Sequence, residues 1–173
     1  VSDPMLTGSP FACTPSSLAP NATATCGPVT YTVTNTNDSG TGSLRQAILD
    51  ACAGSTITFA ANVNGTITLT SGDLIIDKNL TIQGPGANLL TISGNQQWRI
   101  FTLFNTTPAS LSLSGLSLRN GNGQSTVSFN QGLGGAVYFI GTPGNALTLT
   151  DLTIGDSASD IGGGVYAGGN TST

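Results

Sequence analysis

The sequence predicts an all-β chain that winds as a coil of short parallel strands. The main observation is a repeat: residues 111–121 (LSLSGLSLRNG) and 147–157 (LTLTDLTIGDS) match at a constant offset of 36. In both copies apolar residues alternate with small polar ones, a Gly or Asp corner interrupts, and the alternation resumes. Alternation at period two places Leu and Ile on one face of a strand and Ser or Thr on the other. A repeated strand, corner, strand unit is typical of a solenoid.

Further short strands are expected before and between these two copies. Residues 74–84 (LIIDKNLTIQG) form a weaker copy, in which Leu80 is aligned with Leu116 at the same offset of 36. Parallel stacking would place Leu over Leu in the core, and each buried side chain is worth roughly 1.5 to 3 kcal/mol. The expected strands are 56–59, 66–70, 74–76, 80–82, 89–92, 100–104, 111–118, 136–140, 147–154 and 164–166.

The composition excludes several classes of protein. Only 7 % of the residues are charged, while 38 % are hydrophobic, which argues against intrinsic disorder. The four Lys and Arg residues are scattered and the net charge is −4, so we expect no nucleic-acid partner. No apolar run is long enough to span a membrane, and the first residues do not resemble a signal peptide.

Residues 1–28 differ in composition from the rest of the chain. They hold five of the eight prolines, spaced too closely for a helix or a central strand. They also hold Cys13 and Cys26, which in a secreted chain would form a disulfide closing a short loop; the alternative is two free thiols. The run from Cys13 to Cys26 resembles the end of immunoglobulin-like repeats found in large bacterial surface proteins. On that resemblance, residues 1–28 are the tail of a preceding module or a linker.

One helix is expected, over about residues 43–53. Ser43 is a favourable N-cap, and Leu44, Ala47, Ile48 and Ala51 form one apolar helical face. A short amphipathic helix ahead of a strand coil would cap the core and the strand edges of the first coil. Cys52, near the end of this helix, is expected to be a small buried thiol.

Residues 29–173 resemble right-handed parallel β-helix proteins of bacterial surfaces, with the pectate-lyase-like fold. The resemblance is carried by residues 31–51 (YTVTNTNDSGTGSLRQAILDA), which are similar to the Ser-Leu-Arg helix that precedes the first coils in that family. Residues 134–138 (GGAVY) and 162–166 (GGGVY) are similar to strand starts of the same family and of polymorphic outer-membrane and autotransporter-type passengers. The resemblance implies a right-handed winding, a secreted or cell-surface location, and a chain that ends part-way through a longer β-helix.

One coil is longer than this pattern allows. Gly134 lies 23 residues after Leu111, whereas Gly162 lies only 15 residues after Leu147. The sequence therefore predicts an insertion of eight residues within 123–132, expected as a lateral loop that disturbs the regularity of the coil.

Asp151, Asp156 and Asp160 are the densest acidic group and could supply oxygen ligands to calcium. However, the calcium-binding nonapeptide of β-helices is absent, and the spacing of these residues crosses a turn. We therefore interpret them as solvated turn residues and predict no metal site and no cofactor.

Catalysis on polysaccharides is the main enzymatic alternative. Glycoside hydrolysis needs two carboxyl groups about 5 to 10 Å apart, for which Asp73, Asp77 and Asp151 are candidates. Lyase chemistry needs a base, for which Lys78 and Arg119 are the options on the coil corners. No cluster of carboxylates accompanies them, so we assign no catalytic residue.

Trp98 is the aromatic residue best placed for contact with a glycan, because Gln96, Gln97 and Arg99 flank it; packing in the core is the alternative. Phe101 and Phe104 are expected in the core.

The sequence thus favours a non-enzymatic structural or adhesive β-helix segment with glycans or a cell surface as partners. The alternative is a carbohydrate-active β-helix with catalytic coils partly outside this chain.

Overall fold

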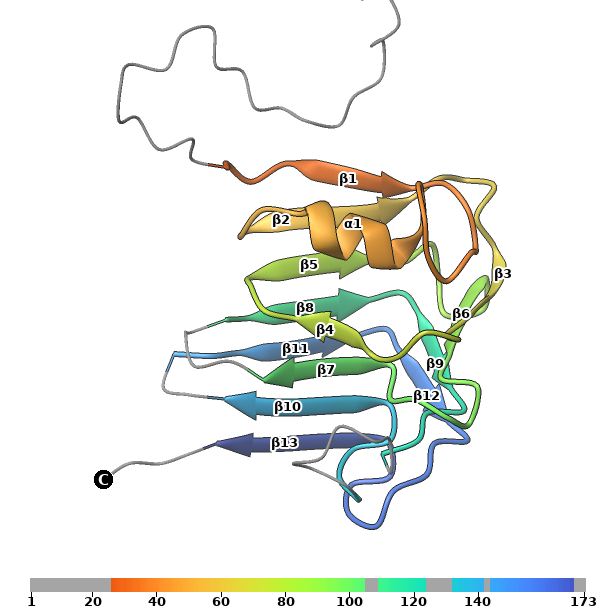
Figure 1. The fold of residues 1–173 in the computed structure, drawn as a ribbon, viewed down its shortest axis with the longest axis vertical. Coiled ribbons are helices and arrows are strands. Elements are labelled where there is room, and N and C mark those ends of the chain that lie inside the picture. Colours follow the sequence, from red (N-terminus) through yellow and green to blue (C-terminus); the bar gives the residue numbers. More distant parts are fainter. Residues whose placement is uncertain (1–25, 105–108, 124–131, 142–143, 170–173) are drawn as a thin grey trace, which may run out of the picture.

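The chain forms a parallel β-helix of three sheets, as the repeat predicted. The structure, a computed structural model, describes residues 26–104, 109–123, 132–141 and 144–169. After the first strand and the helix, each coil passes once through each sheet, and neighbouring strands are parallel throughout the paired segments (Figure 1). The first sheet has the order β1-β2-β5-β8-β11, the second β12-β9-β6-β3 and the third β13-β10-β7-β4.

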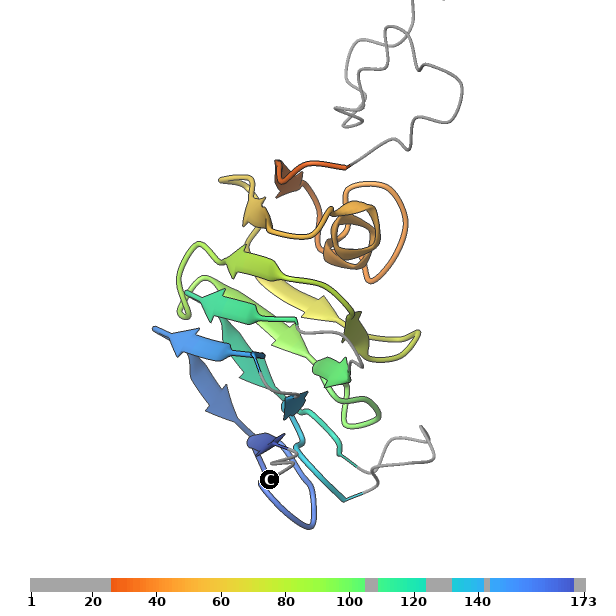
Figure 2. The ribbon, with the colours of Figure 1, turned by 90° about the vertical axis from the view of Figure 1, so that its left-hand side faces the viewer.

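The elements follow one another in the order in which the coils pass through the sheets. They are β1 (Thr30–Val33), α1 (Leu44–Asp50), β2 (Ser55–Phe59), β3 (Gly65–Thr68), β4 (Leu74–Ile76), β5 (Leu80–Gln83), β6 (Leu90–Ser93), β7 (Phe101–Phe104), β8 (Leu111–Ser114), β9 (Ser117–Arg119), β10 (Val137–Gly141), β11 (Leu147–Thr150), β12 (Thr153–Gly155) and β13 (Val165–Gly169). In Figure 1 the first sheet runs left to right behind, the third runs right to left in front, and the coils descend, which is a right-handed winding (Figures 1 and 2).

The register confirms the repeat between the last two coils. Leu111 pairs with Leu147 and Leu113 with Leu149 in the first sheet, and Leu118 pairs with Ile154 in the second. The corner between the two strands of each copy is a residue with positive φ, Gly115 at 63° and Asp151 at 51°. Gly tolerates this conformation freely and Asp more readily than most residues, which explains why these two types occupy the corner.

The alignment of Leu80 with Leu116 was wrong. Leu80 pairs with Leu111, 31 residues further on, and β4, which precedes it, belongs to the third sheet. The shortest coils have 25 residues between paired positions, as from Ser55 to Leu80. The 36-residue period therefore includes a longer loop and is not the unit of the winding.

That longer loop is the predicted insertion, and its length is confirmed. Asn122 bridges to Ala158 and Leu133 to Ile161, so eight more residues lie between the bridges in one coil than in the next. The stem is closed by a hydrogen bond from Gly132 N to Gly123 O of 3.1 Å. Pairing resumes in register beyond it, so the insertion does not disturb the coil. Residues 124–131 themselves lie outside the described part of the chain.

Columns of aliphatic side chains fill the interior. Ile57, Ile82, Leu113 and Leu149 pair in succession along the first sheet. The first three are fully buried. Leu149 is 36 % exposed, because β11 is the last described strand of the first sheet and no further coil stacks on it. The second and third sheets add similar columns, and the buried residues form one continuous cluster.

Helix α1 confirms the predicted cap, although it ends at Asp50, earlier than expected. Ser43 Oγ accepts a hydrogen bond from Gln46 N, as an N-cap does. Leu44, Ala47 and Ile48 are buried, and the helix contacts β1 and β4. In Figure 2 it lies on the side of the third sheet, above β4, where a strand of an earlier coil would otherwise lie. The proposed module tail at 1–28 lies almost wholly outside the described residues.

Candidate functional site

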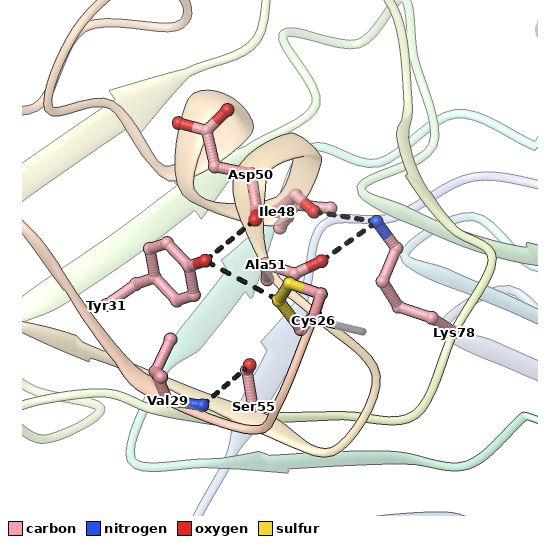
Figure 3. Close-up of a disulfide and its surroundings, with 9 residues drawn as sticks. Cys26, Val29, Tyr31, Ile48, Asp50, Ala51, Ser55 and Lys78 are labelled. Atoms are coloured by element: carbon pink, nitrogen blue, oxygen red, sulfur yellow. Dashed lines mark hydrogen bonds between the residues drawn. A yellow bond between two sulfur atoms is a disulfide. The ribbon is translucent and has the colours of Figure 1, made fainter. Parts of the chain in front are cut away.

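The cysteines pair differently from the prediction. Cys26 forms a disulfide with Cys52, 26 residues further on, with a Cα–Cα distance of 5.6 Å (Figure 3). Cys13, the predicted partner of Cys26, lies outside the described residues, and Cys52 is buried but is not a free thiol. The prediction chose the nearer cysteine along the chain, whereas α1 turns the chain back and brings residue 52 beside the start of β1.

Hydrogen bonds surround this disulfide at the end of the helix (Figure 3). Tyr31 Oη donates to Asp50 O at 2.8 Å and lies 4.0 Å from Cys52 Sγ. Lys78 Nζ donates to Ile48 O and Ala51 O at 3.3 and 3.2 Å. An ammonium group there satisfies carbonyls at the helix C-terminus and interacts favourably with the helix dipole.

The ammonium group of Lys78 is therefore engaged in hydrogen bonds to the helix, which argues against its suggested role as a lyase base. Among the described residues, the carboxylate that forms an ion pair with Lys78 is that of Asp77, which is exposed and 3.3 Å away. Asp73 is buried and accepts a hydrogen bond from Thr102, whereas Asp77 is exposed and paired with Lys78. The two carboxylates therefore lack the shared accessible cleft that glycoside hydrolysis needs.

A second set of polar residues lies on the outer side of the third sheet and is nevertheless buried. Asp73 Oδ2 accepts a hydrogen bond from Thr102 Oγ1 at 2.8 Å and lies 4.0 Å from Arg99 Nη1. Arg99 Nε donates to Leu133 O at 2.9 Å, and its Nη2 donates to Gly123 O at 2.8 Å. Burial lowers the pKa of Arg99, and Asp73 opposes that effect. Arg99 thus joins three coils at the stem of the insertion.

Tyr138 lies between a cation and a second aromatic ring in this cluster. The Arg99 guanidinium lies 4.8 Å from the centroid of the Tyr138 ring, and the Tyr166 ring is stacked on it at 5.7 Å with an interplanar angle of 10°. Burial raises the pKa of Tyr138, although Arg99 opposes the rise. Tyr138 and Tyr166 are the last residues of the two similar segments GGAVY and GGGVY, which pair with each other in the third sheet. The similarity of these two segments was the one feature of the sequence that pointed to this cluster.

A third polar cluster, around Asp38, had no sequence signal. Asp38 Oδ1 accepts from Arg45 Nη2 at 2.7 Å, and its Oδ2 accepts from Thr70 N and Ser71 N at 3.1 and 2.9 Å. Burial alone would raise the pKa of Asp38, but the hydrogen bonds and the charge of Arg45 outweigh it and lower the pKa to about 2.

The acidic group near the last coil shows the geometry of turn residues. Asp151 and Asp156 are exposed and adopt positive φ, and Asp156 accepts a 2.7 Å hydrogen bond from Arg119 Nη1. Across the described ranges, no three His, Cys, Asp or Glu side chains are grouped so that they could hold a metal ion. Arg119 and Asp151 do share one open groove of about 610 Å³ on the outer side of the second sheet, lined by the 84–88 loop.

Trp98 is half-buried and packs against the hydrophobic core. Its Nε1 is enclosed and has no hydrogen-bond partner among the residues that the structure describes. Contact with a glycan through Trp98 stays a prediction. Phe101 is buried in the core as expected, whereas the side chain of Phe104 lies outside the described set.

The outer face of the first sheet is lined by hydroxyl and amide groups. Two rows of outward residues follow the paired strands, and neither row holds a charged side chain. The first row is Thr30, Thr56, Thr81, Ser112 and Thr148, and the second is Thr32, Thr58, Gln83, Ser114 and Thr150. This face is a neutral polar surface and could form hydrogen bonds to an uncharged partner.

No family model, curated protein or solved structure matches the chain. Within the described residues, no helix combines the length and apolar composition required to cross a membrane.

Proposed function

We propose that the chain is a non-enzymatic segment of a secreted or cell-surface bacterial protein, serving as a stiff spacer or adhesive module. The observation that carries the proposal is that Asp73, Asp77, Lys78 and Arg119, four of the five charged side chains suggested for catalysis, have structural partners. Lys78 caps α1, Arg119 pairs with Asp156, and Asp73 is buried beside Thr102. A polysaccharide-cleaving site would instead need several of these groups to converge on one accessible cleft.

Stiffness is supported by the continuity of the core. The sheets stack four or five parallel strands, and one hydrophobic cluster runs through all the coils. Bending such a rod would break ladder hydrogen bonds and separate packed columns at the same time. A repeat structure of this kind resists local opening because each coil is held by the coils on both sides.

An extracellular location is supported by the disulfide, because such bonds form and persist mainly in oxidising compartments. The adhesive version is supported by the neutral hydroxyl face of the first sheet, because hydroxyl and amide groups suit hydrogen bonding to uncharged glycans. This version names glycans or a neighbouring cell surface as the partner.

The test combines a binding and an activity measurement on the full chain. A glycan array is probed with the wild type and with Trp98→Ala, and polysaccharides with and without uronic acids are assayed for new reducing ends and unsaturated products. We expect no cleavage. Binding by the wild type would establish the adhesive module: its loss in Trp98→Ala would assign the contact to Trp98, and its retention would assign it to a surface without Trp98, such as the hydroxyl face. No binding by either protein would leave the spacer. Sustained product formation would overturn the proposal in favour of a carbohydrate-active β-helix.

A further inference from the structure

The disulfide encloses the N-terminal cap of the β-helix. Between Cys26 and Cys52 the chain contains β1, the loop that follows it and α1, and no other helix or strand. β1 is an edge strand that pairs only with β2 in the described part of the first sheet. The bond therefore ties one strand and one helix to the start of β2 and touches no later coil.

The two cysteine residues differ in exposure. Cys26 is exposed, whereas Cys52 is only 6 % exposed. An external thiolate therefore has better access to Cys26 than to Cys52, and attack at Cys26 makes Cys52 the leaving group. The hydroxyl proton of Tyr31 is donated to Asp50 O, whereas the Lys78 ammonium contacts the carbonyl of Ala51, the residue next to Cys52. A cation close by favours the thiolate form of a leaving cysteine.

The cap is held at its two ends by different interactions. At the far end, Arg45 donates hydrogen bonds to Asp38 and to Gly72 O, which fixes the loop after β1 and the start of α1 to the loop before β4. At the near end, Val29 N donates to Ser55 Oγ at 3.1 Å and β1 pairs with β2. Tyr31 Oη also donates to Asp50 O, and Lys78 Nζ donates to Ile48 O and Ala51 O. Loss of the disulfide therefore weakens the near end and leaves the far end in place.

We propose that the Cys26–Cys52 disulfide is a thiol-sensitive latch, whose reduction frees β1 and opens the first sheet at the edge of β2. A dithiol reductant attacks Cys26 Sγ, forms a mixed disulfide with Cys26 and releases Cys52 as a thiolate, which takes up a proton. The second thiol of the reductant then displaces Cys26. The reductant becomes a cyclic disulfide and both cysteines become thiols, a transfer of two electrons and two protons.

The size of the effect follows from the length of the closed loop. In the chain-entropy model, opening a loop of this length shifts the local opening equilibrium by on the order of 100-fold. Coils that lie outside the loop gain no such freedom. A latch therefore predicts a large change confined to the cap and β2, whereas a purely global stabiliser predicts the same change in every coil.

The test is hydrogen–deuterium exchange with mass spectrometry on the full chain, with and without dithiothreitol. We expect at least about tenfold faster exchange of the β1 and β2 amides on reduction, with β8 and β9 unchanged. A variant with Cys26→Ser and Cys52→Ser should exchange fast without reductant and should not respond to it. Cys13→Ser is the matched control and should respond like the wild type.

Alkylation after native-state reduction locates the thiols and confirms that Cys26 and Cys52 are the pair that opened. Equal acceleration in all coils, unchanged exchange in β1 and β2, or loss of the response in Cys13→Ser would each overturn the latch. A disulfide that resists dithiothreitol in the folded protein would overturn it as well.

Discussion

Arg45 and Asp38 form a bridge between the N-terminal cap and the first complete coil. Arg45 Nη2 lies 2.7 Å from Asp38 Oδ1, and the same guanidinium group donates to Gly72 O at 2.6 Å. Asp38 Oδ2 in turn accepts from the backbone N–H groups of Thr70 and Ser71. The bridge thus fixes the loop after β1 and the start of α1 against the segment between β3 and β4.

The Asp38 carboxylate should make stability depend on acid. Its pKa in the folded protein is about 2, below the ordinary value of 3.8, so the folded state favours the charged form. The contribution is fully present above pH 3.8 and is lost as the pH falls towards 2. Allowing for partial solvation, we expect about 1 to 2 kcal/mol of the free energy of unfolding to disappear over that window, measured by denaturant titration at each pH.

Asp38→Asn tests the assignment, because the amide does not titrate. The variant should be less stable than the wild type at neutral pH and should show a flatter loss of stability between pH 3.8 and 2. Asp77→Asn, at an exposed carboxylate, should follow the wild-type curve. Equal pH dependence of Asp38→Asn and the wild type would show that another group is responsible.

The interior of the coils was predictable because it depends on local periodicity. Strands β8, β9, β11 and β12 follow directly from alternating Leu with Ser or Thr, and the capping helix follows from Ser43 and its apolar face. The length of the insertion was also predictable, because two similar Gly-rich segments, 134–138 and 162–166, mark the same point in successive coils.

The polar contacts were not predictable because they depend on the register between coils. Arg99 and Leu133 are 34 residues apart, and Asp38 and Ser71 are 33 apart, so one changed loop length would separate them. The misplaced Leu80 shows the same problem, since loops of different length change the offset from coil to coil. Likewise, the partner of Cys26 depended on where α1 returns the chain.

Gly135 should be intolerant of a side chain because the coils approach closely there. An added Cβ would collide with the carbonyl oxygen of Gly163 in the next coil, and it would also crowd the backbone of Ala158. We expect Gly135→Ala to lower the free energy of unfolding by about 1 to 3 kcal/mol, measured by denaturant titration. The same glycine in the next coil provides the control: Gly163→Ala meets only Ser157 O at 3.5 Å and should change stability by less than about 0.5 kcal/mol. Equal losses would show that the contact with Gly163 O does not set the cost, since the entropy of the unfolded chain alone would favour Ala at both positions.

Lys78 should stabilise the end of α1 through its hydrogen bonds to Ile48 O and Ala51 O. Replacement by Met keeps the aliphatic stem and removes the charge, so we expect a loss of about 1 kcal/mol and faster amide exchange in α1. Asp77→Asn removes the exposed partner of Lys78 and should cost less than about 0.5 kcal/mol. A larger effect for Asp77→Asn than for Lys78→Met would contradict the capping role.

Arg99 should be the most sensitive charged residue in the β-helix. Its guanidinium group is 1 % exposed and donates to the carbonyls of Leu133, Gly134 and Gly123. Arg99→Met would leave these carbonyls without their charged donor and Asp73 without its nearby cation. We expect a loss of about 3 to 5 kcal/mol in the free energy of unfolding.

The control for Arg99 is Arg119, a surface arginine at the end of β9. Arg119 also pairs with an aspartate, but its side chain is 44 % exposed and that of Asp156 is 65 % exposed. Because such surface pairs contribute little, Arg119→Met should cost less than about 1 kcal/mol. Arg99→Lys separates charge from geometry: one ammonium cannot replace several guanidinium hydrogen bonds, so it should recover only part of the loss. Full recovery by Lys would show that the charge near Asp73, and not the three carbonyl contacts, makes Arg99 necessary.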